Sequence, residues 1–275
     1  MVKRRLLCPK LPTPSVPALL PEQEAWHARK VLRLRNGERV EAIDGQGHKV
    51  LAQICFQGEM TYLEFVPLES EGGSSFVGQS VKTEDFLPLQ LKIAVLKAEA
   101  MEWSIEKAVE LGVQSVHPLL TDHTVVQTQA KGAEYFQQRW QKIADQALKQ
   151  CGRLNRLEVH PPIRLKHYLE SIRKEQGSSL ILWCDEAAVG ASSFLGDWLM
   201  QNEKQLQLAP QVHLLIGPEG GWSPSERTEL MACSQELSPV CFARVHLGPL
   251  ILRAETAVLS AVSVISAWMR LQNRA

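Results

Sequence analysis

The sequence predicts an α/β protein in which a parallel sheet is preceded by a small β-rich module. From Leu89 onward, short apolar runs alternate with amphipathic helical stretches, a pattern typical of parallel strands covered by helices on both faces. Residues 1–70 hold extended runs instead, and a glycine- and serine-rich segment follows them. We therefore expect a β domain over 1–70, a linker over 71–88 and an α/β domain over 89–275.

The first module is indicated by a hairpin signal. The segments ERVEAID and KVLAQICFQ read as strands, and Gly45-Gln46-Gly47 lies between them. MTYLEFVPL supplies a further extended run. The polar segment ESEGGSSFVGQS then has the composition of a linker or an exposed loop.

The second part shows several short strands and long helices. Its expected strands are LKIAVL, VQSVHPLL, SSLILWC, VHLLIG and PVCFARVHLG, and its expected helices include AEAMEWSIEKAVELG and QQRWQKIADQALKQ. A last helix, roughly over 254–271, carries apolar residues along one broad face. Such a helix packs against the sheet or against a second subunit.

Composition narrows the class of function. The 275 residues carry no formal net charge, so contact with nucleic acid would depend on local basic clusters. One cluster lies near the start of the chain, where Arg4, Arg5, Lys30 and Arg33 are candidate RNA-binding residues. The six cysteines form no C-x-x-C pair and the histidines show no metal-ligand spacing, so we expect no metal.

The chain also lacks the patterns of secreted and membrane proteins. Prolines interrupt the apolar residues near the start, so no signal peptide is indicated. No apolar run approaches the ~20 residues that span a bilayer. We expect a cytoplasmic protein without membrane contact.

The first chemical motif is a glycine loop between a strand and a helix. VHLLIG ends a strand and GPEGG follows, where open α/β folds bind ligands. Ser223, Pro224 and Glu226 predict a well-capped helix start after it. By itself, the loop could be an ordinary tight turn. It is neither a dinucleotide nor a nucleoside-triphosphate motif, and a neutral glycine-lined pocket suits an adenosine moiety bound through backbone atoms.

The second motif has the same organisation. The strand CFARVHL ends in Gly248-Pro249, and LILRAETAVLS then begins a helix. The negative charge of Glu255 is favourable at the positive N-terminal end of the helix dipole. The positive charge of Arg253 is unfavourable there. We therefore expect Arg253 to bind a carboxylate or a phosphate.

Together, LLIGPEGGWSPSE and HLGPLILRAETA resemble the two C-terminal signatures of the SPOUT class of methyltransferases. The match is closest to the family that methylates N3 of a uridine in small-subunit ribosomal RNA. HARKVLRLRNGERVEAIDGQG resembles the PUA-like β-barrel that opens this family, and RWQKIADQALKQCGR its arginine-bearing helix end. The resemblance covers nearly the whole chain.

The resemblance implies a trefoil-knotted α/β domain, a homodimer and S-adenosylmethionine as cofactor. The partner would be ribosomal RNA or the small ribosomal subunit. The implied cofactor-binding residues lie in both motifs: Leu215, Ile216, Gly217, Pro218, Glu219, Gly220, Leu247, Gly248, Ile251, Leu252 and Arg253. The implied catalytic residues are Arg153, Arg253 and Glu255.

Two departures from the family pattern concern the RNA side. Thr121-Asp122-His123 stands where the family has threonine, an acidic residue and arginine, so a phosphate contact there is lost or pH-dependent. Six residues, LNRLEV, follow QCGR before the pattern resumes. Arg153 matches the family's functional arginine, with Arg156 as the alternative, and no residue is identified as proton acceptor.

Other functions stay open at this point. A non-catalytic ribosome-assembly factor could keep the same fold and pocket. A related methyltransferase could act on transfer RNA or on a ribose 2′-hydroxyl, although the N-terminal barrel favours a base. An enzyme that uses a nucleoside triphosphate or a nicotinamide dinucleotide would need a phosphate motif that the sequence does not contain.

Overall fold

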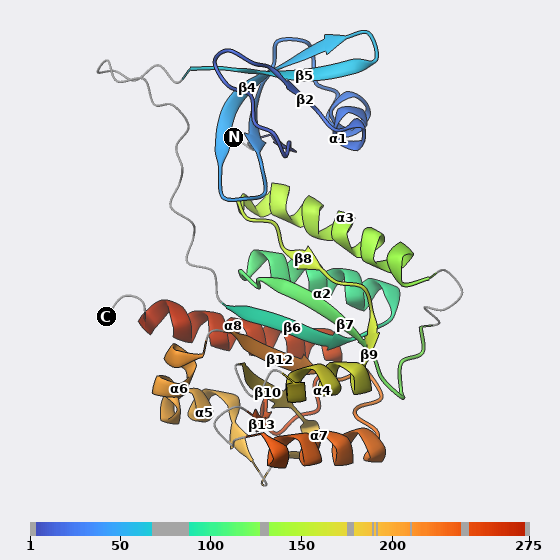
Figure 1. The fold of residues 1–275 in the computed structure, drawn as a ribbon, viewed down its shortest axis with the longest axis vertical. Coiled ribbons are helices and arrows are strands. Elements are labelled where there is room, and N and C mark those ends of the chain that lie inside the picture. The colour runs from blue at the N-terminus through green and yellow to red at the C-terminus, as the bar shows by residue number, and fades with distance from the viewer. Residues whose placement is uncertain are drawn as a thin grey trace. The chain divides into compact units, whose positions relative to one another are not determined.

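The computed structural model describes residues 4–67, 88–126, 132–174, 179–188, 190, 192–209, 211–237 and 242–272. The chain forms two compact units (Figure 1). The first comprises Met1–Asp85 and Asp145–Arg156, and the second comprises Phe86–Ala144 and Leu157–Ala275. Apart from Pro88, the expected linker lies outside the described residues.

The first unit contains a five-stranded sheet. Its strands are β1 (Arg5–Leu7), β2 (Ala18–Leu19), β3 (Arg39–Ile43), β4 (Lys49–Gln57) and β5 (Met60–Phe65), in the order β1-β3-β4-β5-β2. Only the β1–β3 pair is parallel among these strands. β3 and β4 pair with Ile43 opposite Lys49, which confirms the expected hairpin.

One apolar core holds this unit together, and all five strands contribute to it. A helical segment also packs there, formed by α1 (Glu22–Trp26) and a π-helical turn (His27–Val31). This segment was not predicted from the sequence, and each of its two helix types spans only five residues. Its buried Ala25 and Ala28 let the backbone approach the sheet closely.

The segment Asp145–Arg156 belongs to the first unit although it follows Phe86–Ala144 of the second. Arg5 pairs with Glu41 and donates to the carbonyl oxygens of Lys149 and Gln150, at 2.8 and 3.2 Å. Lys149 forms a 2.5 Å ion pair with Glu24. The segment includes the end of α3 (Ala133–Cys151), so this helix extends from one unit into the other.

The second unit contains an eight-stranded parallel sheet, which confirms the expected α/β architecture. The strand order is β11-β13-β10-β12-β6-β7-β8, and β9 also pairs with β7. The bounds are β6 (Leu89–Ala94), β7 (Ser115–Leu120), β8 (Glu158–Val159), β9 (Ile163–Arg164), β10 (Leu180–Cys184), β11 (Ser193–Phe194), β12 (Val212–Ile216) and β13 (Phe242–His246).

Helices cover both faces of this sheet (Figure 1). On one face, α4 (Leu165–Lys174) and α7 (Pro224–Glu236) share an apolar core with β7, β10, β12 and β13. On the other, α8 (Ala254–Gln272) packs against α2 (Ala98–Glu110), α5 (Leu195–Gln201) and β12. The short helices α6 (Glu203–Leu208) and η3 (Glu186–Ala188) complete the unit.

Helix α8 corrects one expectation. By length and composition, its residues Ala254–Leu271 could cross a membrane, whereas no apolar run near that length was predicted from the sequence. Its residues Val258, Ala261, Val262 and Ile265 are completely buried. Only 33% of this segment is buried, so packing in the core of the second unit accounts for one face of the helix and not for its whole apolar composition.

A polar cluster lies on the α4 face of the sheet. Lys92 of β6 is 4% exposed and pairs in register with His117 of β7. His117 stacks on His160 at 3.8 Å between ring centroids. His213 of β12 accepts or donates a 2.9 Å hydrogen bond with the hydroxyl of Tyr168. Burial, reinforced by repulsion from Lys92, lowers the pKa of His117 to about 2 and that of His213 to about 3.

These two histidines predict acid sensitivity. The fold keeps both rings neutral, while the unfolded chain protonates them below a pKa near 6.5, so stability falls as pH drops below that value. Lowering the pH from 7.5 to 5.5 should reduce the unfolding free energy by roughly 2 to 3 kcal/mol through these two histidines. Urea titrations at both pH values would measure it.

Single variants separate this effect from other titrations. His213→Gln should remove about half of the pH-dependent difference. His167→Gln, at an exposed position on α4, should leave it unchanged. If His213→Gln retained the full difference, the burial of this ring would not be its source.

Candidate functional site

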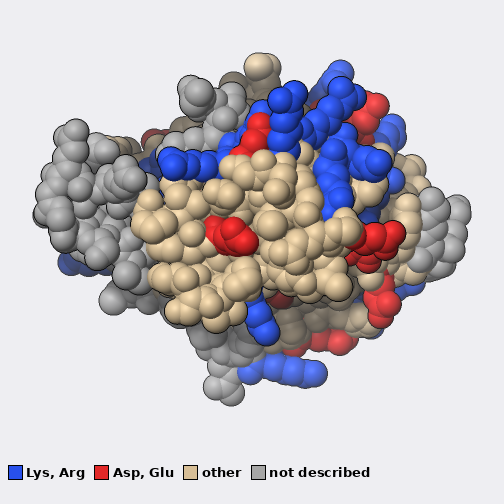
Figure 2. All heavy atoms as spheres, turned by 90° about the horizontal axis from the view of Figure 1, so that it is seen from above, with Lys and Arg blue, Asp and Glu red and all other residues tan. Residues whose placement is uncertain are grey.

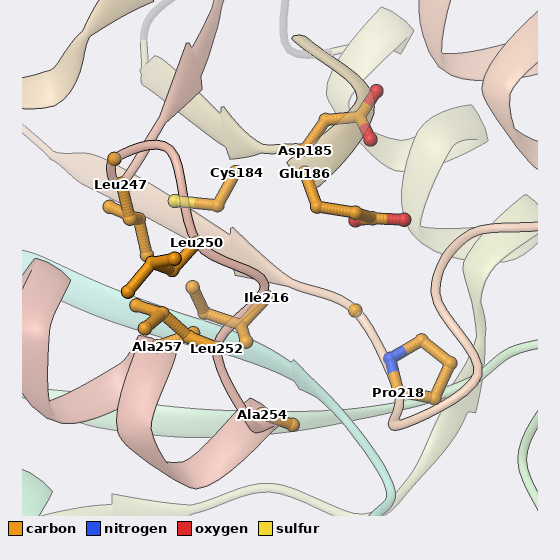
Figure 3. A pocket seen from close by; sticks show the side chains of 12 residues that line it. Cys184, Asp185, Glu186, Ile216, Pro218, Leu247, Leu250, Leu252, Ala254 and Ala257 are labelled. Carbon is orange, nitrogen blue, oxygen red and sulfur yellow. The ribbon is translucent and has the colours of Figure 1, made fainter. Parts of the chain in front are cut away.

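A hollow opens at the carboxyl ends of three neighbouring parallel strands, β13, β10 and β12 (Figure 3). Its empty volume is about 510 Å³, including open solvent at its mouth. It is lined by Cys184, Asp185, Glu186, Ile216, Gly217, Pro218, Leu247, Gly248, Leu250, Leu252, Ala254 and Ala257. Ligands of open α/β folds bind at this edge of the sheet, because loops there diverge from the strand ends.

The hollow brings together the two glycine motifs of the sequence. Six of the expected cofactor-binding residues line it: Ile216, Gly217, Pro218, Leu247, Gly248 and Leu252. Figure 3 shows side chains from both motifs converging on one space, among them Ile216, Leu247 and Leu252. The loops after β12 and β13 therefore form one pocket.

The other five expected residues do not belong to the lining of the hollow. Leu215 is completely buried in the α4 and α7 core. Glu219 accepts a hydrogen bond from the backbone N–H of Lys97 at 3.2 Å. Gly220 is exposed, as are Ile251 and Arg253. Their roles in cofactor binding stay predictions.

A third segment of the lining, Cys184–Glu186, begins with the last residue of β10 and was not predicted from the sequence. The apolar strand SSLILWC was recognised, and its carboxyl end lies at the same edge as the two motifs. The acidic pair directly after it was the available signal. The lining also includes three residues that were not predicted, Leu250, Ala254 and Ala257.

Asp185 is the most constrained charged group of the hollow. Its side chain is completely buried, and it forms ion pairs with Arg227 of α7 at 3.1 Å and with Arg244 of β13 at 2.6 Å. Oδ1 also accepts the backbone N–H of Ala187 at 3.1 Å. Because both carboxylate oxygens are engaged, Asp185 ties the end of β10 to α7 and β13.

The glycine loop after β12 depends on close backbone approaches. A side chain on Gly217 would place its Cβ 3.0 Å from the ring of Trp222, which is buried and donates to the carbonyl of Cys184 at 3.0 Å. Gly221 has a φ of +69°, which L side chains rarely adopt. These positions explain the glycines of the motif.

The start of α7 is fixed by the expected capping box. The hydroxyl of Ser223 accepts the N–H of Glu226 at 3.1 Å, and the Glu226 carboxylate accepts the N–H of Ser223 at 2.9 Å. The hydroxyls of Ser223 and Ser225 donate to Asp122, at 2.6 and 3.0 Å. These hydrogen bonds lower the pKa of the Asp122 carboxyl.

His123 extends this contact to the glycine loop. Its Nδ1 lies 3.0 Å from the carbonyl oxygen of Gly220 and 2.9 Å from that of Gly221. Two carbonyl acceptors require this nitrogen to carry the hydrogen. The segment that was expected on the RNA side therefore holds the loop that lines the hollow.

The chemistry of the hollow suits an adenosine-containing ligand. Most of its walls are aliphatic or glycine backbone, which suits a flat base. No lysine or arginine belongs to the lining, so a triphosphate would find no counter-charge there. No group of three or more metal-ligating side chains occurs among the described residues.

The three expected catalytic residues lie in different places. Arg253 immediately precedes α8 and is exposed, and Glu255 is half-buried in the first turn of that helix. Neither side chain has a polar partner within the described ranges. Arg153 is 4% exposed and belongs to the segment assigned to the first unit. The alternative, Arg156, forms a 2.7 Å ion pair with Asp145.

The expected RNA-binding residues differ in availability. Lys30 and Arg33 are exposed, whereas Arg4 pairs with Glu38 at 2.7 Å. Arg5 is half-buried and is used in the internal contacts of the first unit. Figure 2 shows lysine and arginine side chains gathered along one border of the face seen from above.

Comparisons with known families match both units. Residues 83–266 match the family model of an RNA methyltransferase domain, and residues 20–54 match that of an RNA methyltransferase PUA domain. The chain is 31% identical over 243 residues to "Ribosomal RNA small subunit methyltransferase E" of Synechocystis sp., covering 88% of this chain and 70% of that protein.

Solved structures agree over nearly the full length. A Legionella pneumophila protein described as a methyltransferase, solved with the bound cofactor SAM, superposes with a TM-score of 0.77 at 27% identity, covering 97% of this chain and 98% of that one. Ribosomal RNA small subunit methyltransferase E from Neisseria gonorrhoeae, bound to S-adenosyl methionine, shares the fold with a TM-score of 0.75 at 24% identity, covering 96% and 97%.

The buried carboxylate of Asp185 makes a testable prediction. Asp185→Ala removes the ion pair of Arg244 with this residue and leaves Arg227 only its pair with the more exposed Glu186, and should lower the unfolding free energy by about 2 to 3 kcal/mol. Glu236→Ala removes the exposed ion pair with Arg173 and should cost less than about 1 kcal/mol. Urea denaturation of both variants measures the difference. Equal small losses would mean that Asp185 does not hold the strand ends together.

Proposed function

Because this chain belongs to the RNA methyltransferase family that includes ribosomal RNA small subunit methyltransferase E, we propose that it methylates small-subunit ribosomal RNA with S-adenosylmethionine as cofactor. The observation that carries the proposal is the meeting of the loops after β10, β12 and β13 in one hollow. Its finer form assigns N3 of a uridine as the methylated atom. We place the reaction in the cytoplasm.

The residues of the hollow fit the cofactor. Aliphatic side chains and glycine backbone offer an apolar slot for adenine and hydrogen-bonding groups at close range. Arg253, exposed at the start of α8, would bind the carboxylate of the methionine moiety. When bound, S-adenosylmethionine supplies an electrophilic methyl group.

The target nitrogen must lose a proton during the reaction. N3 lies on the Watson–Crick edge, so the uridine must be unpaired or flipped out of a helix. Negative charge then spreads onto O2 and O4, and a guanidinium stabilises it. We assign this role to Arg153, contributed by the neighbouring subunit of a homodimer. Its side chain is 4% exposed in the single chain, so this role requires the guanidinium to become accessible when the dimer binds RNA.

The base that accepts the proton is not the thiol of the hollow. Burial raises the pKa of Cys184 to about 12, so this group stays protonated at neutral pH. A protonated thiol cannot accept the imide proton. Glu255, half-buried in the first turn of α8, would orient groups in the pocket.

The proposal includes the assembly implied by the resemblance. Leu250 and Ile251, in the loop after β13, are 77% and 86% exposed. Large apolar side chains at such exposure favour burial against another protein surface. A homodimer with a knotted second unit would cover them, and light scattering after size exclusion would give its mass.

The function is tested by nucleoside mapping. Ribosomal RNA from cells with and without the gene is digested, and its modified nucleosides are measured by mass spectrometry. Loss of one 3-methyluridine from the small-subunit RNA is expected. Loss of a different methylated nucleoside would support the methyltransferase activity and contradict N3 of uridine as its target. An unchanged profile would contradict both the activity and the target.

Arg153 gives a second test. Arg153→Ala should leave the dissociation constant for S-adenosylmethionine within about twofold, and reduce turnover on ribosomal subunits at least about a hundredfold. Arg156→Ala should reduce turnover far less, because Arg156 pairs with Asp145. A larger loss of turnover in Arg156→Ala than in Arg153→Ala would assign the role to Arg156.

A further inference from the structure

We propose that Glu186 binds the ribose hydroxyls of the cofactor, an inference that rests on the proposed function. Glu186 begins the short helix η3, directly after β10, and lines the hollow. Its side chain is 39% exposed. Figure 3 shows it between the glycine loop that carries Pro218 and the end of β10.

One oxygen of this carboxylate is available. Oε1 forms an ion pair with Nη2 of Arg227, and Oε2 has no polar partner among the residues that the structure describes. Asp185, the other acidic residue of the lining, uses both of its oxygens in ion pairs. Glu186 is therefore the charged side chain of the lining that can accept a hydrogen bond from a ligand.

The Glu186 carboxylate is held by Arg227 on one side and lies against the glycine loop on the other. Arg227 binds Glu186 while it also binds Asp185, so the guanidinium is itself held by a completely buried group. On the other side, Oε1 lies 2.6 Å from the point where a Cβ on Gly221 would stand. A side chain at position 221 would displace the carboxylate from this place. The ion pair with Arg227 restrains the carboxylate before a ligand binds, which reduces the entropy lost on binding.

The charge of this pair favours hydroxyl donors. Arg227 already neutralises Glu186, so a second cation, such as the ammonium of the methionine moiety, gains little there. A diol offers neutral donors to the remaining oxygen, and acidic side chains at the ends of parallel strands bind ribose hydroxyls in other α/β folds. The ribose diol is therefore the part of the cofactor that fits Glu186.

The test compares ligands with and without the diol. Calorimetry on the full chain measures the dissociation constants of S-adenosylmethionine, S-adenosylhomocysteine, 5′-methylthioadenosine and 2′,3′-dideoxy-5′-methylthioadenosine. Glu186→Ala should weaken the first three by about ten- to a hundredfold, the range expected for a hydrogen bond to a charged group. The dideoxy compound should bind the variant and the unaltered chain alike.

Two further variants test whether Glu186 binds the ribose directly or only holds Arg227 in place. Arg227→Met removes the partner but keeps the carboxylate, so 5′-methylthioadenosine should still bind more tightly than its dideoxy form. Glu236→Ala, which breaks the exposed pair with Arg173, should change none of the constants. If Glu186 only supported Arg227, both pocket variants would weaken all four ligands equally, and the ribose assignment would be overturned.

The remaining outcomes are also decisive. Weaker S-adenosylhomocysteine with unchanged 5′-methylthioadenosine in Glu186→Ala would assign the carboxylate to the methionine ammonium and overturn the proposal. Unchanged constants for every ligand would do the same. If the unaltered chain bound none of the four, the proposed cofactor itself would fail, a result distinct from a failure of Glu186 alone.

Discussion

The candidate site depends on one buried carboxylate. Asp185 lies where β10 ends, and its two oxygens bind arginines from β13 and α7, so three elements that are distant in sequence meet at a fixed geometry. Ionised groups are costly to bury unless they are paired, which makes this arrangement sensitive to the loss of any partner. The loops after β10, β12 and β13 diverge from this point, and their separation defines the hollow.

A second support reaches the glycine loop from the end of β7, two strands away from β12 in the sheet. Asp122 and His123, which follow β7, bind the start of α7 and the backbone of the glycine loop. His123, where the resembled family has arginine, therefore has a structural role. Its Nδ1–H can donate to the two carbonyl oxygens of the glycine loop. His123 therefore supports the glycine loop after β12, whatever its position contributes to RNA binding.

Local features could be predicted from the sequence, and non-local ones could not. The hairpin at Gly45–Gly47, the capping box at Ser223 and the strand ends before both glycine motifs depend on residues close together in the chain. The role of Asp185 depends on arginines 42 and 59 residues away, which no local pattern connects. Arg5 shows the same limit, since its basic character suggested RNA contact while the fold uses it to bind carbonyls at 149 and 150.

The balance of charge at the hollow connects its construction with its ligand. Asp185 and Glu186 carry two negative charges, and Arg227 and Arg244 carry two positive ones, so the network is neutral as a whole. A wall with no net charge does not repel the positively charged sulfonium of the cofactor. It also does not bind this charge strongly, so the cofactor and its uncharged thioether product are held in a similar way. Recognition then falls to shape and to single hydrogen bonds, for which a carboxylate with one engaged and one available oxygen is well suited.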